Sequence, residues 1–177
     1  MSTRVLRVGI FGGGIVGGGT YELVQRCNAS GRFSEIGARI EVVKICVRDL
    51  KKPRDFEVTA GRTEFVTDYG AILNDPSINC VVEVMGGTTH AKDVVFGAIA
   101  AGKHVVTANK ALIAAYLVEI QQLLQANPSV QFLFEAAVCG GIPIIHALHT
   151  DFLADRITKV RGSRRVGAEK EGRPPPR

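Results

Sequence analysis

The chain has 177 residues, 46% of them apolar, which is enough to bury the core of one ordinary domain. Its formal charge of +5 is concentrated in residues 161–177, so the body of the chain is close to neutral. This argues against a nucleic-acid partner, because phosphate binding needs clustered basic residues on the folded part. No apolar stretch is long enough to span a membrane, and no leader sequence precedes the first strand pattern. We therefore expect a cytoplasmic protein with no membrane partner; a plastid location would require a longer precursor.

Strand and helix patterns alternate along the chain. Strands are predicted over residues 5–11, 40–47, 80–84, 104–107 and 130–134. Helices are predicted over residues 16–27, 68–73, 91–101, 116–125 and 143–153. Continuous apolar strands separated by helices indicate a mainly parallel, doubly wound α/β sheet with helices on both faces. In such sheets ligands bind outside the carboxyl ends of the strands, so the loops at those ends are the candidate site.

A glycine-rich turn follows the first predicted strand. Gly12, Gly14 and Gly17 have the spacing G-x-G-x-x-G, which allows a tight turn, close approach of backbone N–H groups to phosphates, and close packing of helix on strand. The helix predicted from residue 16 offers, with Ile15 and Val16 at its start, unpaired N–H groups and the positive end of its dipole. A turn that merely joins strand to helix is the alternative. The flanking strand and helix favour a dinucleotide pyrophosphate site, and with it a Rossmann-like fold.

A basic turn follows the second predicted strand. NAD-binding chains usually place an acidic residue here to bind the ribose 2′-hydroxyl, but this chain has Arg48, followed by Lys51, Lys52 and Arg54. An arginine suits a 2′-phosphate. A solvated basic turn would give the same pattern, and both interpretations stay open at this stage. On the first of them, NADP is the expected cofactor and NAD is tolerated.

Two further strand ends are candidates for the site. The third predicted strand leads into Met85, Gly86 and Gly87, where backbone could approach a ribose or nicotinamide, or simply turn. The fourth ends in a polar corner that closes with Lys110. A lysine there can orient a carbonyl or relay a proton, although a lone lysine is more often a solvated surface charge.

These blocks, together with residues 135–143, resemble the N-terminal nucleotide-binding domain of homoserine dehydrogenase over residues 5–162. The most specific blocks are residues 102–111, with their Thr-Ala-Asn-Lys sequence, and residues 135–143. The resemblance implies an oxidoreductase that reversibly interconverts L-aspartate 4-semialdehyde and L-homoserine with NAD(P), a step in threonine, methionine and isoleucine biosynthesis.

The resemblance also implies roles for individual residues. The glycine turn and Arg48 would hold the cofactor, Met85 and Gly86 would flank its nicotinamide ribose, and Lys110 would contact it and act at the reacting end. The positions whose carbonyl groups bind a monovalent cation, Na⁺ or K⁺, in this family are matched by Glu135, Val138, Gly140 and Ile142.

From residue 163 the chain departs from the family pattern. Residues 163–177 have few apolar side chains and contain a run of three prolines, so we expect a disordered, basic, proline-rich tail. The family continues instead into a catalytic domain that holds the substrate and most of the homodimer interface. Residues 1–162 are thus expected to be a cofactor-binding domain that turns over homoserine or aspartate semialdehyde only if that domain is supplied. The alternative is a non-catalytic nucleotide-binding module or regulatory partner of a full-length subunit.

Overall fold

A computed structural model describes residues 4–161. Its six strands form one parallel sheet in the order β3-β2-β1-β4-β5-β6. The strands are β1 (Arg4–Phe11), β2 (Ala38–Cys46), β3 (Glu64–Val66), β4 (Cys80–Glu83), β5 (His104–Thr107) and β6 (Phe132–Leu133). The chain thus builds outward from β1 on one side, returns, and builds outward on the other, which confirms the predicted doubly wound, Rossmann-like fold. The predicted boundary at residue 162 and the tail beyond it lie outside the described residues.

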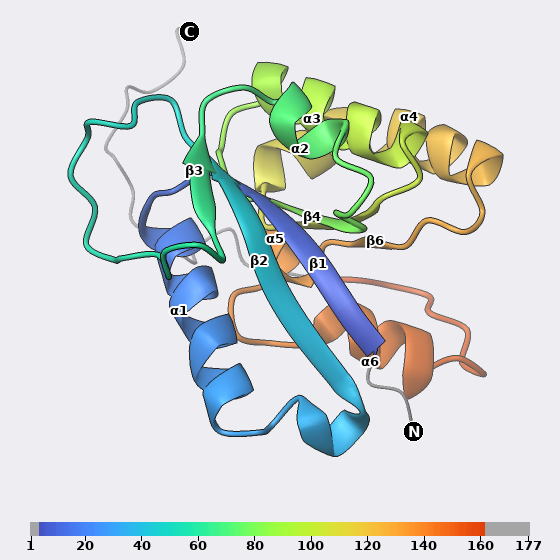
Figure 1. The fold of residues 1–177 in the computed structure, drawn as a ribbon. Coiled ribbons are helices and arrows are strands. Elements are labelled where there is room, and N and C mark those ends of the chain that lie inside the picture. The colour runs from blue at the N-terminus through green and yellow to red at the C-terminus, as the bar shows by residue number, and fades with distance from the viewer. Residues whose placement is uncertain (1–3, 162–177) are drawn as a thin grey trace, which may run out of the picture.

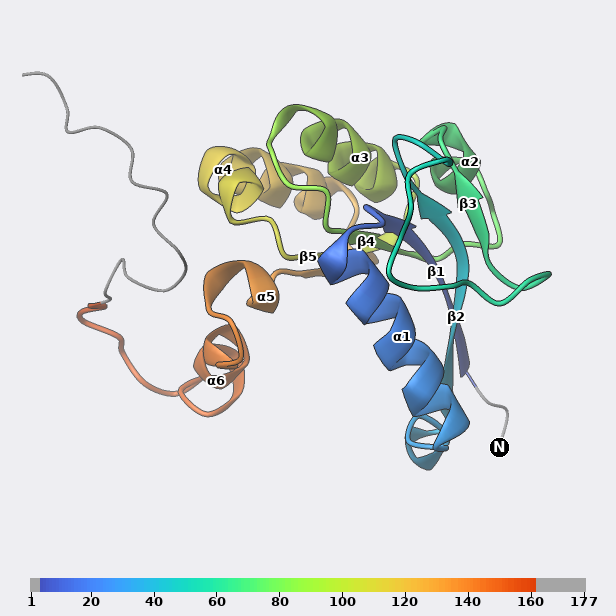
Figure 2. The same cartoon turned by 90° about the vertical axis from the view of Figure 1, so that its left-hand side faces the viewer.

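Helices cover both faces of the sheet (Figures 1 and 2). One face is covered by α2 (Gly70–Leu73), α3 (Thr89–Ala100) and α4 (Lys110–Ala126). The long helix α1 (Ile15–Ala29) lies on the other face, where α5 (Glu135–Val138) and α6 (Ile144–Thr150) follow β6 (Figure 2). A single 3₁₀ turn, η1 (Ser34–Ile36), precedes β2.

Side chains of β1 alternate between two apolar cores, as the period of a strand requires. Val8 and Ile10 belong to the core beneath α1, which also buries Tyr21 of that helix. Phe11 belongs to the larger core formed with α3 and α4. Because the C-terminal half of β1 is buried and paired on both edges, it fixes where the loop that follows it must lie.

Several element boundaries differ from those predicted, among them the starts of α4 and α3. Helix α4 begins at Lys110 rather than at residue 116, because the side chain of Asn109 accepts the N–H of Leu112 at 3.1 Å and caps the helix. Helix α3 begins at Thr89, two residues before the predicted start at residue 91, and neither Thr88 nor Thr89 caps it through a side-chain hydrogen bond.

The sheet edges also differ from the prediction. The strand predicted over residues 130–134 is only two residues long, because β6 pairs with β5 at Val105 and Val106 alone. The edge strand β3 was not predicted; its three residues pair with the end of β2. Both are edge strands that pair on one side only, where short strands are common.

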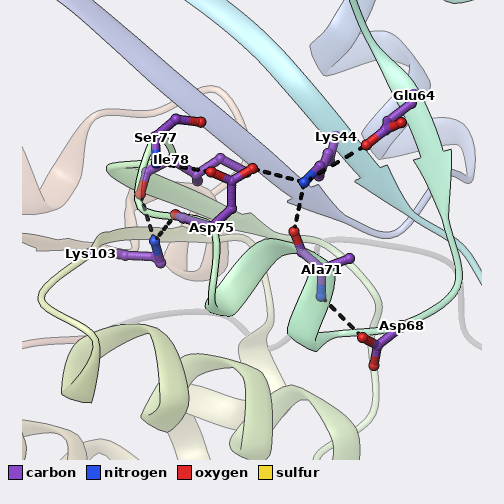
Figure 3. Close-up of polar contacts among 8 residues, drawn as sticks. All are labelled: Lys44, Glu64, Asp68, Ala71, Asp75, Ser77, Ile78 and Lys103. Atoms are coloured by element: carbon purple, nitrogen blue, oxygen red, sulfur yellow. Dashed lines mark hydrogen bonds and ion pairs between the residues drawn. The ribbon is translucent and has the colours of Figure 1, made fainter.

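A charged cluster ties β2 to the turn that enters β4 (Figure 3). The Lys44 Nζ lies 2.7 Å from an oxygen of the Asp75 carboxylate and 3.0 Å from the carbonyl oxygen of Ala71. The buried Lys103 donates to the carbonyl oxygens of Asp75 and Ile78, both at 2.6 Å. The Lys44 ammonium holds the pKa of Asp75 well below its usual range, whereas burial lowers the pKa of Lys103. The turn precedes β4, at the opposite end of that strand from the candidate site, so we assign the cluster a structural role.

Among the helices of residues 4–161, none combines the length and apolar composition needed to cross a bilayer.

Candidate functional site

A cleft of about 950 Å³ opens at the carboxyl ends of β1, β2 and β4. Its walls come from the glycine turn after β1, the connection after β2, and residues 84–86 after β4, with Tyr69 and His90 completing them. The strand order reverses between β1 and β4, and doubly wound sheets bind their ligands at that reversal.

Gly12, Gly14 and Gly17, the three glycines of the G-x-G-x-x-G motif, have different surroundings. Gly12 has a φ of +112°, and a Cβ there would lie 2.7 Å from the carbonyl oxygen of Val84. A Cβ on Gly17 would strike the carbonyl oxygen of Gly12, so this glycine allows α1 to pack against the turn. A Cβ on Gly14 would meet only open space. Gly14 is therefore the position where a ligand can approach the backbone.

The N-terminus of α1 opens into the cleft with neither a capping side chain nor an acidic residue in its own first turn. Gly14 is the residue before the helix, and it offers no side chain to cap the first turn, which also lacks acidic residues. Ile15 is 92% exposed, and the first helical hydrogen bond runs from the N–H of Gly18 to the carbonyl of Gly14 at 2.8 Å. The N–H of Gly12 donates to the carbonyl oxygen of Cys46 at 3.0 Å, whereas the N–H groups at the start of the helix precede the first helical bond and can donate to an anion. The helix dipole favours negative charge there.

The basic residues after β2 divide into two kinds. Arg48 and Lys52 are exposed and line the cleft. Arg54 also lines it, but its guanidinium donates to the carbonyl oxygens of Lys52 at 2.8 Å and Asp49 at 2.5 Å, and lies 4.7 Å from the ring centre of Phe65. Arg54 therefore fixes the shape of the loop, which leaves Arg48 as the arginine that can meet a ligand.

An aromatic wall was missed by the sequence reasoning. The rings of Tyr69 and His90 lie 6.0 Å apart, and Tyr69 also packs edge-on against Phe11 at 5.7 Å. Burial raises the pKa of Tyr69, and it raises the pKa of the adjoining Cys46 thiol to about 11, so both groups are neutral at pH 7. Tyr69 follows the unpredicted strand β3, so only recognition of that edge strand could have placed it at the site.

Next to the cleft, a polar corner joins the end of β4 to the start of α4. The Glu83 side chain is 0% exposed, and its oxygens accept the N–H of Met85 at 2.9 Å and the hydroxyl of Thr107 at 2.7 Å. Lys110, the first residue of α4, is exposed. Glu83 was also missed as a site residue, although it is the one charged residue in an otherwise apolar strand sequence, which is a usable signal.

The structure brings together most but not all of the predicted cofactor residues. Those that line the cleft are Gly12, Gly14, Ile15, Arg48, Met85 and Gly86. Gly17 lies beneath the turn, while Val16, 55% exposed, and Lys110 lie outside the cleft lining.

The four predicted cation-binding residues lie elsewhere, at the α5–α6 connection. Glu135 and Val138 belong to α5, and Gly140 and Ile142 follow it. The carboxylate of Glu135 accepts the N–H groups of Ile145 and His146, both at 2.8 Å, and thereby links α5 to the start of α6. No group of three or more His, Cys, Asp or Glu side chains suited to a metal ion occurs within residues 4–161.

The reversed strand order, the glycine turn and the exposed N-terminus of α1 define a doubly wound dinucleotide-binding domain. Residues 12–135 match the family described as homoserine dehydrogenase, NAD binding domain. The chain therefore belongs to the homoserine dehydrogenase family, through its NAD-binding domain.

Individual relatives agree with this assignment. The homoserine dehydrogenase of Bacillus subtilis is 36% identical over 159 residues, which cover 90% of this chain and 36% of that protein. The Synechocystis enzyme of the same name is 43% identical over 157 residues, covering 89% and 35%. The crystal structure of a homoserine dehydrogenase from Thiobacillus denitrificans matches with a TM-score of 0.77 and 44% identity, covering 88% of this chain and 35% of that one. The chain thus spans roughly a third of the length of these relatives.

Proposed function

We propose that this chain binds NADP(H), with NAD(H) tolerated, as the cofactor-binding part of an oxidoreductase that reversibly interconverts L-homoserine and L-aspartate 4-semialdehyde. The observation that carries the proposal is the cleft, in which an uncapped helix N-terminus and the exposed Arg48 face one space in a chain of this family. The bound nicotinamide would supply or accept the hydride.

The residues of the chain would divide the work of binding. Backbone N–H groups at Gly14 and the start of α1 would bind the pyrophosphate, and Arg48 would pair with the 2′-phosphate. Met85 and Gly86 would flank the nicotinamide ribose, because they line the opposite wall of the cleft. Lys110 would orient the reacting carbonyl or relay its proton from the start of α4.

The 2′-phosphate role is tested by titrating the chain with NADPH and NADH. We expect Arg48→Ala to weaken NADPH by about tenfold or more, since it removes a charge-assisted contact, and to change NADH by less than about twofold. Lys51→Ala is the matched control, because Lys51 is an exposed basic residue of the same connection that does not line the cleft. Equal weakening of both cofactors by Arg48→Ala would show that the arginine does not read the 2′-phosphate.

A monovalent cation, Na⁺ or K⁺, is proposed at the backbone carbonyl groups of Glu135, Val138, Gly140 and Ile142. Carbonyl oxygens are hard donors that suit such a cation. Replacing Na⁺ and K⁺ by tetramethylammonium is expected to lower the thermal unfolding midpoint of the chain, because binding to the folded state alone stabilises it. A midpoint that does not depend on the cation would contradict the site.

A second candidate is a non-catalytic partner of a full-length homoserine dehydrogenase subunit. It is favoured by apolar side chains exposed around β6 and α6, among them Leu133 at 56%, Ile142 at 58% and Leu153 at 79%. In both cases we propose that the chain acts in the cytoplasm, in keeping with its four free cysteines. We propose no nucleic-acid or membrane partner. The substrate would be turned over only when the rest of the family's length is supplied.

A further inference from the structure

The buried carboxylate of Glu83 is held entirely by neutral donors. Its side chain is 0% exposed, and within residues 4–161 it takes part in no ion pair. Its oxygens accept the N–H of Met85 at 2.9 Å and the hydroxyl of Thr107 at 2.7 Å, with the side-chain amide of Asn109 at 3.4 Å. Each of these partners donates, so both carboxyl oxygens of Glu83 act as acceptors. Burying a polar group is costly unless its hydrogen bonds are made in this way.

The donors are themselves held by a second set of bonds. The hydroxyl oxygen of Thr107 accepts the N–H of Asn109 at 3.0 Å, which points the hydroxyl hydrogen toward the carboxylate. The side-chain amide of Asn109 also donates to the carbonyl oxygen of Gly87 at 2.7 Å. Its oxygen accepts the N–H of Leu112 and so caps α4 at Lys110. The network therefore runs from the turn after β4 to the first residues of α4.

The turn after β4 depends on this network for its shape. Gly86 and Gly87 both have positive φ, of 74° and 71°, and glycine is the residue with the most backbone freedom to lose. The network holds the turn at the N–H of Met85 and at the carbonyl of Gly87, on either side of Gly86. Gly86 between them is exposed and lines the cleft.

We infer that Glu83 is a positioning residue that fixes the Met85–Gly87 turn and the start of α4 relative to each other. It thereby preorganises the part of the cleft proposed for the nicotinamide ribose. It also positions Lys110, the first residue of α4. This inference rests on the proposed function, because it assumes that the cleft binds a dinucleotide with its nicotinamide ribose at Met85 and Gly86. Being fully buried, Glu83 acts through Met85, Thr107 and Asn109 and does not touch the ligand itself.

The test compares two ligands on the full chain. NADPH would use the whole cleft, whereas 2′-phospho-ADP lacks the nicotinamide and its ribose and would use only the part near α1 and Arg48. Glu83→Gln keeps the size of the side chain but places an NH₂ group against donors. We expect it to weaken NADPH by about tenfold and 2′-phospho-ADP by less than about twofold. Thr107→Val, which removes the hydroxyl from the same network, is expected to act in the same direction, and it carries the test if Glu83→Gln does not fold.

The matched control is Thr63→Val. Thr63 is also buried, and its hydroxyl donates to the carbonyl of Val42 at 2.6 Å, away from the cleft lining. This variant should lower the unfolding midpoint while leaving the ratio of the two affinities unchanged, so a general loss of stability cannot imitate the expected result. Hydrogen exchange of unliganded protein adds a readout without ligand: residues 84–88 should exchange faster in Glu83→Gln than in wild type, and no faster in Thr63→Val.

The remaining outcomes contradict either the positioning role of Glu83 alone or the proposed function as well. If wild type binds both ligands and Glu83→Gln weakens them equally, or weakens neither, the positioning role is wrong while the proposed function stands. If wild type binds neither ligand, the proposed function is wrong and the inference falls with it.

Discussion

The protein itself leaves no room for a side chain at Gly17, but it leaves room for one at Gly14. A Cβ on Gly17 would strike backbone, the carbonyl oxygen of Gly12, and backbone cannot move aside cheaply. A Cβ on Gly14 would meet no protein atom within 4 Å, and its φ of −90° is accessible to any residue. The same glycine-to-alanine change should therefore damage the fold at one position and ligand binding at the other.

We expect Gly17→Ala to lower the free energy of unfolding by about 2 kcal/mol, the usual cost of forcing atoms into a filled space. Gly14→Ala should leave the denaturation curve unchanged and weaken NADPH, because its methyl group occupies the approach to the N–H groups. Gly19→Ala is the control for stability alone: its Cβ also meets open space, inside α1, and it should stabilise the chain by about 0.5 kcal/mol. Denaturant titrations and NADPH fluorescence measure both effects. A Gly14→Ala chain that binds NADPH as well as wild type would contradict the assigned phosphate approach.

The sequence predicts the role of a single residue when that role depends on neighbours close to it in the chain. The spacing of Gly12, Gly14 and Gly17 predicted that a ligand could approach Gly14 and that α1 packs closely at Gly17, since both depend on neighbours within a few residues. Glu83 could not be assigned in the same way, because its partners Thr107 and Asn109 come from another strand. Which side chains meet across strands is set by sheet order and register, and neither is local.

At the scale of elements, the ion pair of Lys44 and Asp75 joins β2 to the turn that enters β4 (Figure 3). Their side chains are only 18% and 19% exposed, so solvent screens the pair less than it would on the surface. The pair lowers the pKa of Asp75 and raises that of Lys44. A carboxyl group with a lowered pKa in the folded state stabilises the fold above its unfolded pKa of about 3.9, and this contribution is lost as the pH falls toward the lowered value.

We expect Asp75→Asn to destabilise the chain by about 2 kcal/mol at pH 7, because it leaves the Lys44 ammonium without its carboxylate. The difference from wild type should shrink as the pH is lowered from about 5 to about 2, since protonation removes the same charge from wild type. Denaturant titrations across this range measure the difference. Glu119→Gln, at an exposed carboxylate of α4, should show no comparable effect. A difference that stayed constant with pH would mean that the charge of Asp75 contributes nothing.

The order of most strands and helices was predictable from the sequence, because apolar runs mark the elements and glycine residues mark where several of them end. The exceptions have physical causes. Strand β3 has three residues, too few to show a periodic pattern, and it forms only because β2 offers an edge to Glu64, Phe65 and Val66. The start of α4 depends on the Asn109 cap, a single side-chain bond that an apolar pattern does not reveal.

At the scale of the whole molecule, exposed apolar side chains are unevenly placed. Among the described residues, those from β6 onward include Leu133, Ile142, Phe152 and Leu153, each at least 49% exposed. Exposed apolar side chains concentrated in one segment are typical of a surface that contacts another protein. Family membership fits this, since the relatives are about three times as long as the part that matches.

We therefore expect the purified chain to elute in size-exclusion chromatography above the 19.0 kDa of a monomer. Leu153→Asp, at a side chain that is 79% exposed, should shift it toward the monomer by placing a charge in the contact. Val118→Asp is the control, because Val118 is 64% exposed but lies on α4, across the sheet. A wild-type chain that remains monomeric at high concentration would count against this surface.

The central position of β1 bears on how the chain folds during its synthesis. β1 leaves the ribosome before the other five strands of the sheet, and β2 can pair with one of its edges soon afterwards. Its other edge pairs with β4, whose Cys80 lies opposite Val8. That edge therefore stays unpaired until the chain has emerged as far as β4. Pairing over such sequence separations is slow, and an unpaired apolar strand can associate with other chains. The nascent chain is thus most exposed to misassembly before β4 emerges, and this is the interval in which a chaperone would help it most.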